Sequence, residues 1–300
     1  MQTSPAARRK SKIRTTRNDR LFTVCNTAFM VLLMISILYP FWDLLVESFN
    51  NGYANGLSRL WPTRPTLANY AKVLGNRYIW SGYRETLIIT AAGTFCSVLA
   101  TMIGAYALSK ESFPFRKFFT LMIVIPMFFG GGLIASYLWN VQLGLRNTRW
   151  VLFLPSLVNS YNLMVMRNFF SGVPKELEES AFIDGASNIR TLFVIYLPVS
   201  LAVIATVTLW EMVGYWNSWF TATIYINKAD RFPLQVVLRR ILSEGSSEMM
   251  ETDGGTGMSV GNLDNLKAAT MFVCILPIMC VYPFLQKYFV KGTLVGAIKG

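Results

Sequence analysis

Residues Leu21–Trp42 read LFTVCNTAFMVLLMISILYPFW, a run of 22 residues without a charged side chain. An α-helix rises 1.5 Å per residue, so about 20 apolar residues cross the ~30 Å hydrocarbon core of a bilayer. The run is longer than the apolar part of a signal peptide, and no A-x-A cleavage pattern follows it. We therefore expect it to remain in the protein as a first membrane span.

Five further apolar runs of membrane length follow along the chain. They lie at residues 86–109, 118–139, 150–170, 192–220 and 268–285. The whole composition agrees, because 53% of the 300 residues are hydrophobic and only 15% are charged, too few to cover the surface of a soluble protein of this size. The sequence predicts an all-α integral membrane protein built as a six-helix bundle over residues 21–290.

Basic residues set the expected orientation. Positively charged segments stay on the cytoplasmic side of a membrane, and the tail 1–20 holds seven of them: Arg8, Arg9, Lys10, Lys12, Arg14, Arg17 and Arg20. Six spans return the carboxyl-terminal tail 291–300 to the same side, so both termini are expected in the cytoplasm. The long segments 47–84 and 227–267 are then extracellular loops. The net charge of +12 is largely a signal of topology, and we expect no nucleic-acid binding.

The residue inventory excludes several kinds of chemistry. The chain has no histidine, which rules out Ser-His-Asp triads and histidine metal ligands. Its four cysteines lie inside apolar runs without a CxxC spacing, and no GxxxxGK[ST] phosphate loop is present. We expect no catalytic residue, no metal and no bound cofactor.

Proline and glycine interrupt four of the expected spans. They are Pro126, Gly130–Gly132, Pro155, Pro198, Pro277 and Pro283. A backbone carbonyl freed in lipid must be satisfied by a neighbouring helix or by a water-lined cavity, so these residues predict bent helices around a path. The alternative is that proline and glycine are simply common in membrane helices.

A polar segment joins the fourth and fifth runs. Residues 171–190 read SGVPKELEESAFIDGASNIR, and Pro174 followed by three glutamates is typical of a helix start. We expect a short helix over about 174–186 on the cytoplasmic face, ended by Gly185, with Ser187 capping the next helix. Its small residues leave a shallow surface for another protein, although an ordinary acidic connector would look the same.

The order Glu179-Ser180-Ala181, three residues, Gly185, nine residues, Ile195-x-Leu197-Pro198 resembles the EAA loop of the membrane subunits of bacterial ABC importers. The run ELEESAFIDGAS is similar to the carbohydrate-importing, maltose-type branch, with Ser180 in place of the usual alanine. The resemblance extends over nearly the whole chain, and it implies a type I importer bundle.

In such importers the EAA helix sits in a cleft of a cytoplasmic ATPase subunit and couples ATP hydrolysis to transport. The resemblance implies that Glu179 is a polar anchor there and that Ala181 and Gly185 allow close docking. The tail 291–300 is a second contact candidate. The positions expected to couple the chain to the ATPase are Glu179, Ser180, Ala181, Asp184, Gly185, Ile195, Leu197 and Pro198.

The same resemblance implies partners and cargo. The partners are two ATPase subunits that bind ATP and magnesium, a second, different permease subunit, and an extracytoplasmic solute-binding protein, all at the bacterial cell membrane with its lipid. The expected substrate is an oligosaccharide, acidic uronic-acid oligomers included, followed by a monosaccharide derivative or polyol. Alternatives are a non-sugar solute, an ATP-independent channel or secondary transporter, and a membrane enzyme.

Aromatic and hydrogen-bonding residues that suit a sugar occur in two of the runs. These path candidates are Asn159, Tyr161 and Asn162 in the fourth, and Trp210, Glu211, Tyr215, Trp216 and Asn217 in the fifth. A helix starting near Leu192 would place Glu211 about 29 Å further along, hydrated near the outer boundary. An interfacial aromatic belt and helix-to-helix hydrogen bonds are the alternatives.

The second outer loop carries an amphipathic stretch, residues 232–242, followed by a region rich in Ser, Gly, Glu and Met. The stretch predicts a helix, and we expect the second region to be flexible. Arg239 and Arg240 are candidates for docking the solute-binding protein, although a plain surface helix explains them equally well.

Overall fold

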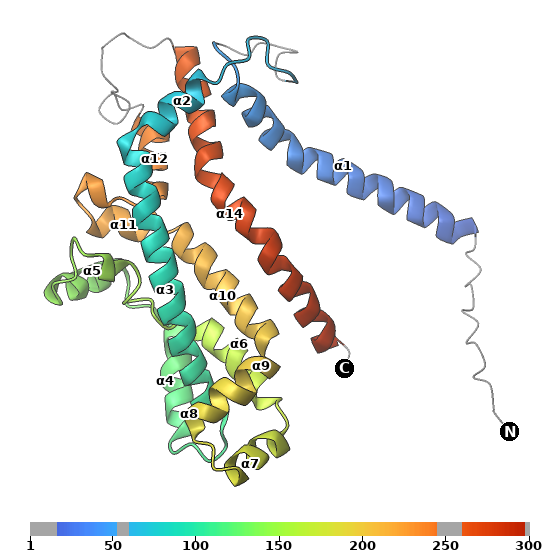
Figure 1. The fold of residues 1–300 in the computed structure, drawn as a ribbon, viewed down its shortest axis with the longest axis vertical. Coiled ribbons are helices and arrows are strands. Elements are labelled where there is room, and N and C mark those ends of the chain that lie inside the picture. Colours follow the sequence, from blue (N-terminus) through green and yellow to red (C-terminus); the bar gives the residue numbers. More distant parts are fainter. Residues whose placement is uncertain (1–16, 53–59, 245–259, 298–300) are drawn as a thin grey trace.

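The computed structural model describes residues 17–52, 60–244 and 260–297. In these ranges the chain forms helices joined by loops and contains no β-strand, which confirms the all-α prediction (Figure 1). Three helices are long: α1 (Arg17–Ser48), α3 (Arg77–Ser109) and α14 (Val260–Ala297). The shorter helices are α2 (Ala68–Gly75), α4 (Arg116–Phe128), α5 (Leu133–Gln142), α6 (Ser160–Ser171), α7 (Lys175–Ile183), α8 (Asn188–Thr191), α9 (Leu197–Val199), α10 (Leu201–Trp216), α11 (Phe220–Tyr225) and α12 (Leu234–Glu244).

Three helices of the described chain are long and apolar enough to cross a membrane, or up to five if each of two bent pairs is one span. The pairs are α4 with α5, bent by 119°, and α8–α9 with α10, bent by 89°. Both bends lie at expected helix breakers. Gly132, before α5, has a left-handed φ of 78°, and Pro198 directly precedes the bend before α10. In contrast, Pro277 and Pro283 lie inside the uninterrupted α14.

The expected fourth span, residues 150–170, is not a continuous helix. A short 3-10 turn at Arg149–Leu152 is followed by loop, and α6 begins only at Ser160. Pro155 has no N–H to offer a helix there. Asn159 starts α6 as its N-cap, since its side chain accepts a hydrogen bond from the Asn162 backbone N–H at 3.1 Å. The first half of this range therefore forms loop, and only its second half is helical.

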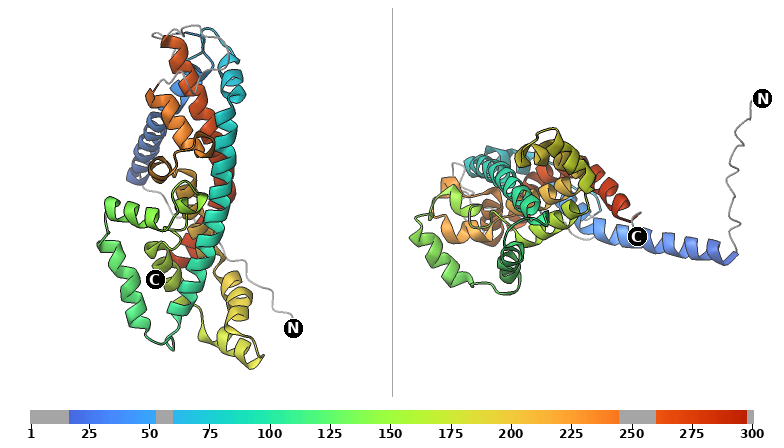
Figure 2. Two further views of the ribbon diagram at one scale, coloured as in Figure 1. Left: turned by 90° about the vertical axis from the view of Figure 1, so that its left-hand side faces the viewer. Right: turned by 90° about the horizontal axis from the view of Figure 1, so that it is seen from below.

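Helix α3 is the central element of the bundle. It packs against α10, α6 and α12 (Figures 1 and 2), and small residues on it let these helices approach. A Cβ on Gly82 would lie 3.1 Å from the Leu234 Cα of α12, and one on Gly93 would lie 3.0 Å from the Tyr215 ring of α10. Both glycines therefore mark close helix contacts.

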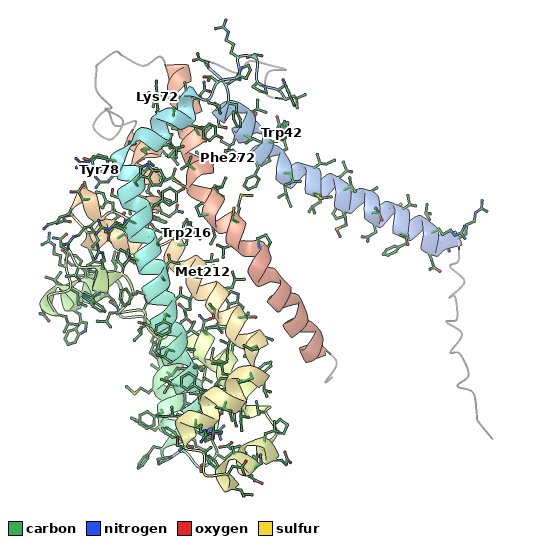
Figure 3. The ribbon with its side chains drawn as sticks, viewed as in Figure 1. Trp42, Lys72, Tyr78, Met212, Trp216 and Phe272 are labelled. Atoms are coloured by element: carbon green, nitrogen blue, oxygen red, sulfur yellow. The ribbon has the colours of Figure 1, made fainter. Side chains whose placement is uncertain are left out.

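Two hydrophobic cores lie at opposite ends of α3. The core toward α2 and α12 includes Ile79, Ile89, Trp216, Phe232 and Leu234. The core toward α7 includes Met102, Met166, Phe170, Tyr196 and Val207. Side chains of α1 and α14 cover the end of the bundle near α2, where Figure 3 labels Trp42 and Phe272. Further along, α1 leaves the bundle and is almost entirely exposed.

An ion pair fixes the loop before α6 to α3. Arg149 Nε and Nη2 donate to the two carboxylate oxygens of Glu85 at 2.6 and 2.7 Å. The Glu85 side chain is only 3% exposed, whereas that of Arg149 is 39% exposed. The next residue, Thr86, accepts a hydrogen bond from the Leu234 N–H at 2.8 Å and so holds the start of α12.

Because Glu85 is buried and Arg149 is partly exposed, we expect substitutions of the two residues to lower stability by different amounts. Arg149→Met leaves the buried Glu85 carboxylate without its partner, which lowers the free energy of unfolding by about 3–5 kcal/mol. Glu85→Leu leaves a guanidinium that can turn to water, so we expect a smaller loss of roughly 1–3 kcal/mol. Thermal unfolding of the purified protein in one detergent should show the larger drop in Tm for Arg149→Met. Arg77→Met, which breaks the exposed Arg77–Asp230 pair, is the control and should change little; equal losses in all three variants would contradict this account.

Candidate functional site

Helix α7 forms where the sequence predicts it, beginning one residue after Pro174. Its end is a Schellman motif. The Gly185 N–H donates to the Phe182 carbonyl at 3.0 Å and the Ala186 N–H donates to the Ala181 carbonyl at 2.9 Å. This turn requires the left-handed φ of 76° that Gly185 adopts. Glycine is therefore needed at 185 for the backbone, because a Cβ there would meet nothing within 4 Å.

The next helix is capped as expected. The side chain of Ser187 accepts a hydrogen bond from the Arg190 N–H at 3.4 Å and begins α8. The two short helices α7 and α8 lie at one end of the bundle (Figure 1). The Schellman motif and the Ser187 cap define the turn that joins them.

The side chains of α7 divide between an exposed and a buried face. Glu179 and Asp184 are exposed, and so are two large apolar side chains, Phe182 and Ile183, the latter 86% exposed. Ser180 and Gly185 are also exposed. An exposed apolar pair flanked by acids is typical of a surface that another protein covers.

Ala181 corrects one expectation. Its side chain is only 8% exposed, so atoms of this chain cover it, and it does not lie on a surface open to a partner. It falls on the same helix face as Glu178, three residues earlier, whose side chain is also largely covered. Its small size therefore lets α7 lie close to its own subunit.

The last three positions of the expected coupling motif follow α8. Residues Leu192–Tyr196 form a π-helical turn, in which Ile195 packs against the core toward α7, as does Leu197 just after it. Pro198 is exposed in α9, directly before the 89° bend. These residues shape the bend rather than lie on the exposed face of α7.

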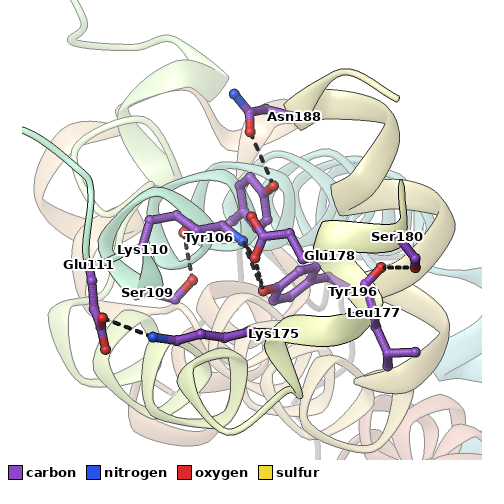
Figure 4. A network of polar contacts seen from close by, with 10 residues as sticks. All are labelled: Tyr106, Ser109, Lys110, Glu111, Lys175, Leu177, Glu178, Ser180, Asn188 and Tyr196. Carbon is purple, nitrogen blue, oxygen red and sulfur yellow. Dashed lines mark hydrogen bonds and ion pairs between the residues drawn. The ribbon is translucent and has the colours of Figure 1, made fainter. Parts of the chain in front are cut away.

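Four side chains, Tyr106, Lys110, Glu178 and Tyr196, meet beneath α7 and are called the Lys110 cluster here (Figure 4). Lys110 Nζ pairs with the Glu178 carboxylate and donates to the Tyr196 hydroxyl at 2.8 Å. That hydroxyl donates to Glu178 Oε2 at 2.9 Å. The ammonium also lies 4.2 Å from the Tyr106 ring centre and 4.3 Å from that of Tyr196, so it makes two cation–π contacts.

The cluster is shielded from water. The side chains of Lys110 and Glu178 are 15% and 14% exposed, and this burial lowers the pKa of Lys110, against the opposing effect of Glu178. A second ion pair joins the same two segments at the surface, where Lys175 Nζ donates to Glu111 at 2.9 Å with both side chains largely exposed. It lowers the pKa of Glu111 and raises that of Lys175.

Four of the path candidates come together where α6 and α10 meet. Asn162 Nδ2 donates to Glu211 Oε1 at 2.6 Å, and both side chains are buried. Beside them the rings of Tyr161 and Trp210 lie 5.8 Å apart, partly exposed. Aromatic rings next to buried hydrogen-bonding groups are chemically suited to a sugar.

Glu211 differs from its expected position. The bend at Pro198 means that its helix starts at Leu201, about 15 Å before Glu211 instead of the expected 29 Å. The carboxylate is accordingly buried against α6 and not hydrated at a boundary. Burial of a carboxyl in a membrane bundle is costly, and the Asn162 amide provides a partner for it.

The remaining path candidates do not join this group. Asn159 caps α6, and the Tyr215 hydroxyl shares a 2.7 Å hydrogen bond with Ser97 of α3. Trp216 lies in the core toward α12, where its indole Nε1 has no hydrogen-bond partner, and Asn217 is exposed after the end of α10. Among the described residues no group of three or more His, Cys, Asp or Glu side chains is arranged to hold a metal ion.

The family profile described as binding-protein-dependent transport system inner membrane component matches residues 4–295. The chain belongs to this family of inner membrane transport components. It is therefore a transporter permease. The resemblance noted in the sequence is confirmed by this match, which covers nearly all of the described chain.

Curated relatives and a solved structure agree over nearly full length. The permease is 38% identical over 288 residues to Protein LplC of Bacillus subtilis, covering 95% of this chain and 97% of that one. It is 34% identical to the polygalacturonan/rhamnogalacturonan transport system permease protein YtcP of the same organism, covering 94% and 99%. A bacterial ABC transporter involved in the import of the acidic polysaccharide alginate contains a chain with a TM-score of 0.83 and 28% identity, covering 91% of this permease and 98% of that chain.

At the opposite end of the permease, the predicted amphipathic helix is α12, and both of its arginines lie on aromatic rings. The guanidinium of Arg239 is 3.7 Å from the Trp219 ring centre, and that of Arg240 is 4.2 Å from the Phe232 ring centre. The expected flexible region after α12 lies mostly at 245–259, outside the described residues, as do residues 1–16 of the basic tail.

The sequence analysis missed Lys110, Glu178, Tyr106 and Tyr196. One signal was available, because Lys110 is the first charge after the apolar run 86–109 and a lysine there has to find water or a partner. The sequence pattern around Lys110 does not indicate that Glu178 is this partner.

The end of α7 gives a prediction about residue 185. Gly185→Val places a β-branched residue at a left-handed φ, which should destabilise the end of α7 by about 1–2 kcal/mol. Gly185→Asn should cost less, because asparagine tolerates this conformation. Hydrogen exchange of the amides in 175–187 should rise clearly in the valine variant and little in the asparagine variant. Equal exchange in both variants would show that backbone conformation is not what glycine supplies.

Proposed function

We propose that this permease is one membrane subunit of an ATP-driven importer that moves sugar oligomers delivered by an extracytoplasmic solute-binding protein. The observation that carries the proposal is the geometry of α7. It is a short helix with a defined end that projects from the bundle and exposes acidic and apolar side chains. Family membership over residues 4–295 supports the same assignment.

Helix α7 would dock in a cleft of a cytoplasmic ATPase subunit. Phe182 and Ile183 would be buried on docking, and the exposed carboxylates of Glu179 and Asp184 would contact polar or basic groups at its rim. Docking that buries two large apolar side chains is favourable by about 25 cal/mol per Å² of apolar surface. In this assignment the subunit itself hydrolyses nothing, and ATP with magnesium binds to two partner ATPases.

The orientation follows from the same assignment. With α7 in the cytoplasm, α2 and α12 lie on the outer side, where Arg239 and Arg240 could meet the solute-binding protein. Helix α14 runs from that outer end toward the side of α7, whereas α1 diverges from the bundle and reaches the outer end with its carboxyl-terminal half (Figure 1). The course of α14 supports a cytoplasmic carboxyl terminus, and we propose the same side for the amino terminus. The nearly bare surface of α1 suits a second permease subunit, which we propose to be a different chain.

The proposed substrate is an oligosaccharide that contains uronic acids. One similar protein is named for polygalacturonan and rhamnogalacturonan transport, and the similar solved transporter is involved in the import of the acidic polysaccharide alginate. In this chain the Tyr161–Trp210 surface could stack on a sugar face, and the Asn162–Glu211 pair lies beside it for hydroxyl groups. Two alternatives remain: the importer carries a non-sugar solute, or the protein is a transporter that does not use ATP. The following experiment distinguishes both from the proposed function.

The test is reconstitution of the permease in proteoliposomes with its second subunit, both ATPases and the solute-binding protein. Uptake of labelled oligogalacturonate that requires ATP and the binding protein is the expected result. Uptake that proceeds without ATP would identify a secondary transporter and overturn the proposal. ATP-driven uptake of an amino acid but of no sugar would overturn the substrate assignment alone.

Bulky residues on the exposed part of α7 should uncouple the importer. In Glu179→Trp and Gly185→Trp we expect uptake per ATP hydrolysed to fall by about tenfold or more, because a loss of 1.4 kcal/mol in docking is already tenfold. Membrane insertion should be unchanged. Ser112→Trp, exposed at the same end but outside α7, is the control, and normal uptake in both α7 variants would reject the coupling role.

The buried pair between α6 and α10 gives a prediction about substrate handling. Glu211→Leu leaves the buried Asn162 amide without its acceptor, a penalty of about 1–3 kcal/mol, whereas Glu211→Gln keeps an acceptor oxygen. We expect the leucine variant to raise the KM for uptake and the glutamine variant to stay near the wild type, with basal ATP hydrolysis unchanged in both. An unchanged KM in the leucine variant would remove Glu211 from the path.

A further inference from the structure

The Lys110 cluster connects three separate parts of the permease. Tyr106 and Lys110 belong to the end of α3 and the residue after it, Glu178 belongs to α7, and Tyr196 ends the π-helical turn before α10. Helices α3 and α10 pack extensively on each other. The cluster thus attaches α7 to the end of α3 and to the π-helical turn that precedes α10 (Figure 4).

We propose that the Lys110 cluster is the joint that transmits movement of α7 to α3 and α10, with Lys110 and Tyr196 as positioning residues for coupling. The inference deepens the proposed function and rests on it. Lys110 holds the Glu178 carboxylate of α7, and the Tyr196 hydroxyl bridges the two charged groups. A displacement of α7 therefore pulls on the end of α3 and on the bend before α10 at once.

Burial is what makes this contact able to transmit movement. At the surface, water replaces either partner of an ion pair at little cost, so exposed pairs contribute little. In the cluster, whose two charged side chains are largely shielded, separating Lys110 from Glu178 would leave each charge without its opposite charge and with the Tyr196 hydroxyl as its remaining polar contact. The three parts are therefore expected to move together, whereas the exposed Lys175–Glu111 pair could open freely.

The local backbone is consistent with a device for positioning Tyr196. A π-helical turn is rare and occurs frequently at functional sites, and this one covers Leu192–Tyr196. The Tyr196 ring is held edge-on by Tyr106 at 4.9 Å and by Phe170 at 5.4 Å between ring centres. These ring contacts place its hydroxyl against the ion pair.

The experiment compares two lysine variants in the complete importer, reconstituted as above. Lys110→Met removes the buried charge and keeps an apolar chain of similar length. Lys175→Met breaks the exposed pair between the same two segments and is the matched control. We expect uptake per ATP hydrolysed to fall about tenfold in Lys110→Met and to change less than about twofold in Lys175→Met. Lys110→Arg, which keeps the charge, should restore most of the coupling.

A milder pair of variants covers the case in which Lys110→Met fails to assemble. Tyr196→Phe removes only the hydroxyl that bridges Lys110 and Glu178. Tyr106→Phe removes a hydroxyl whose hydrogen bond is long, 3.5 Å to Asn188 Oδ1. Reduced coupling in Tyr196→Phe with normal coupling in Tyr106→Phe is expected, with normal ATPase binding in both.

The outcomes separate this inference from the proposed function. If wild-type importer shows no ATP-driven uptake, the proposed function fails. If the wild type is coupled and Lys110→Met and Tyr196→Phe are coupled as well, only the joint is overturned. Equal defects in the two lysine variants would also overturn it, because they would show that burial of the pair has no special role.

Discussion

Charged side chains inside the bundle need partners, and this requirement determines which segments of the permease are held against α3. Glu85 is paired with Arg149, and Lys110 is paired with Glu178. One pair lies toward each end of α3, and each joins α3 to a segment more than 60 residues away in sequence. An unpaired charge at either place would cost several kcal/mol. The pairs therefore fix the loop before α6 at one end and α7 at the other.

The consequences extend from α3 to the rest of the chain. Small residues on α3 allow α10 and α12 to pack closely, and the bend at Pro198 brings Glu211 of α10 against Asn162 of α6. The coupling surface and the path candidates thus lie on elements that meet the same helix. In the proposed importer, this arrangement gives α7 a short mechanical connection to the helices beside the substrate.

Much of the fold follows from local sequence, because a run such as 86–109 has to be helical in lipid and Gly185 has to end α7. What the sequence could not provide was pairing over long distances. The range 150–170 is mostly apolar but begins with a 3-10 turn and loop, since a mostly apolar composition does not exclude a helix that starts only after the Asn159 cap. Likewise, helical periodicity placed Ala181 on a face without saying that this face is turned to its own subunit.

In the proposed importer, α7 and α3 move as one body through the Lys110 cluster. Spin labels on the exposed positions Ile103 of α3 and Glu176 of α7, in a variant lacking the four native cysteines, report their separation by pulsed electron resonance. If the Lys110 cluster joins the two helices, the distance distribution is the same in the resting and the ATP-bound importer, and it changes on ATP binding once Lys110→Met is introduced. A change on ATP binding with Lys110 intact would contradict it.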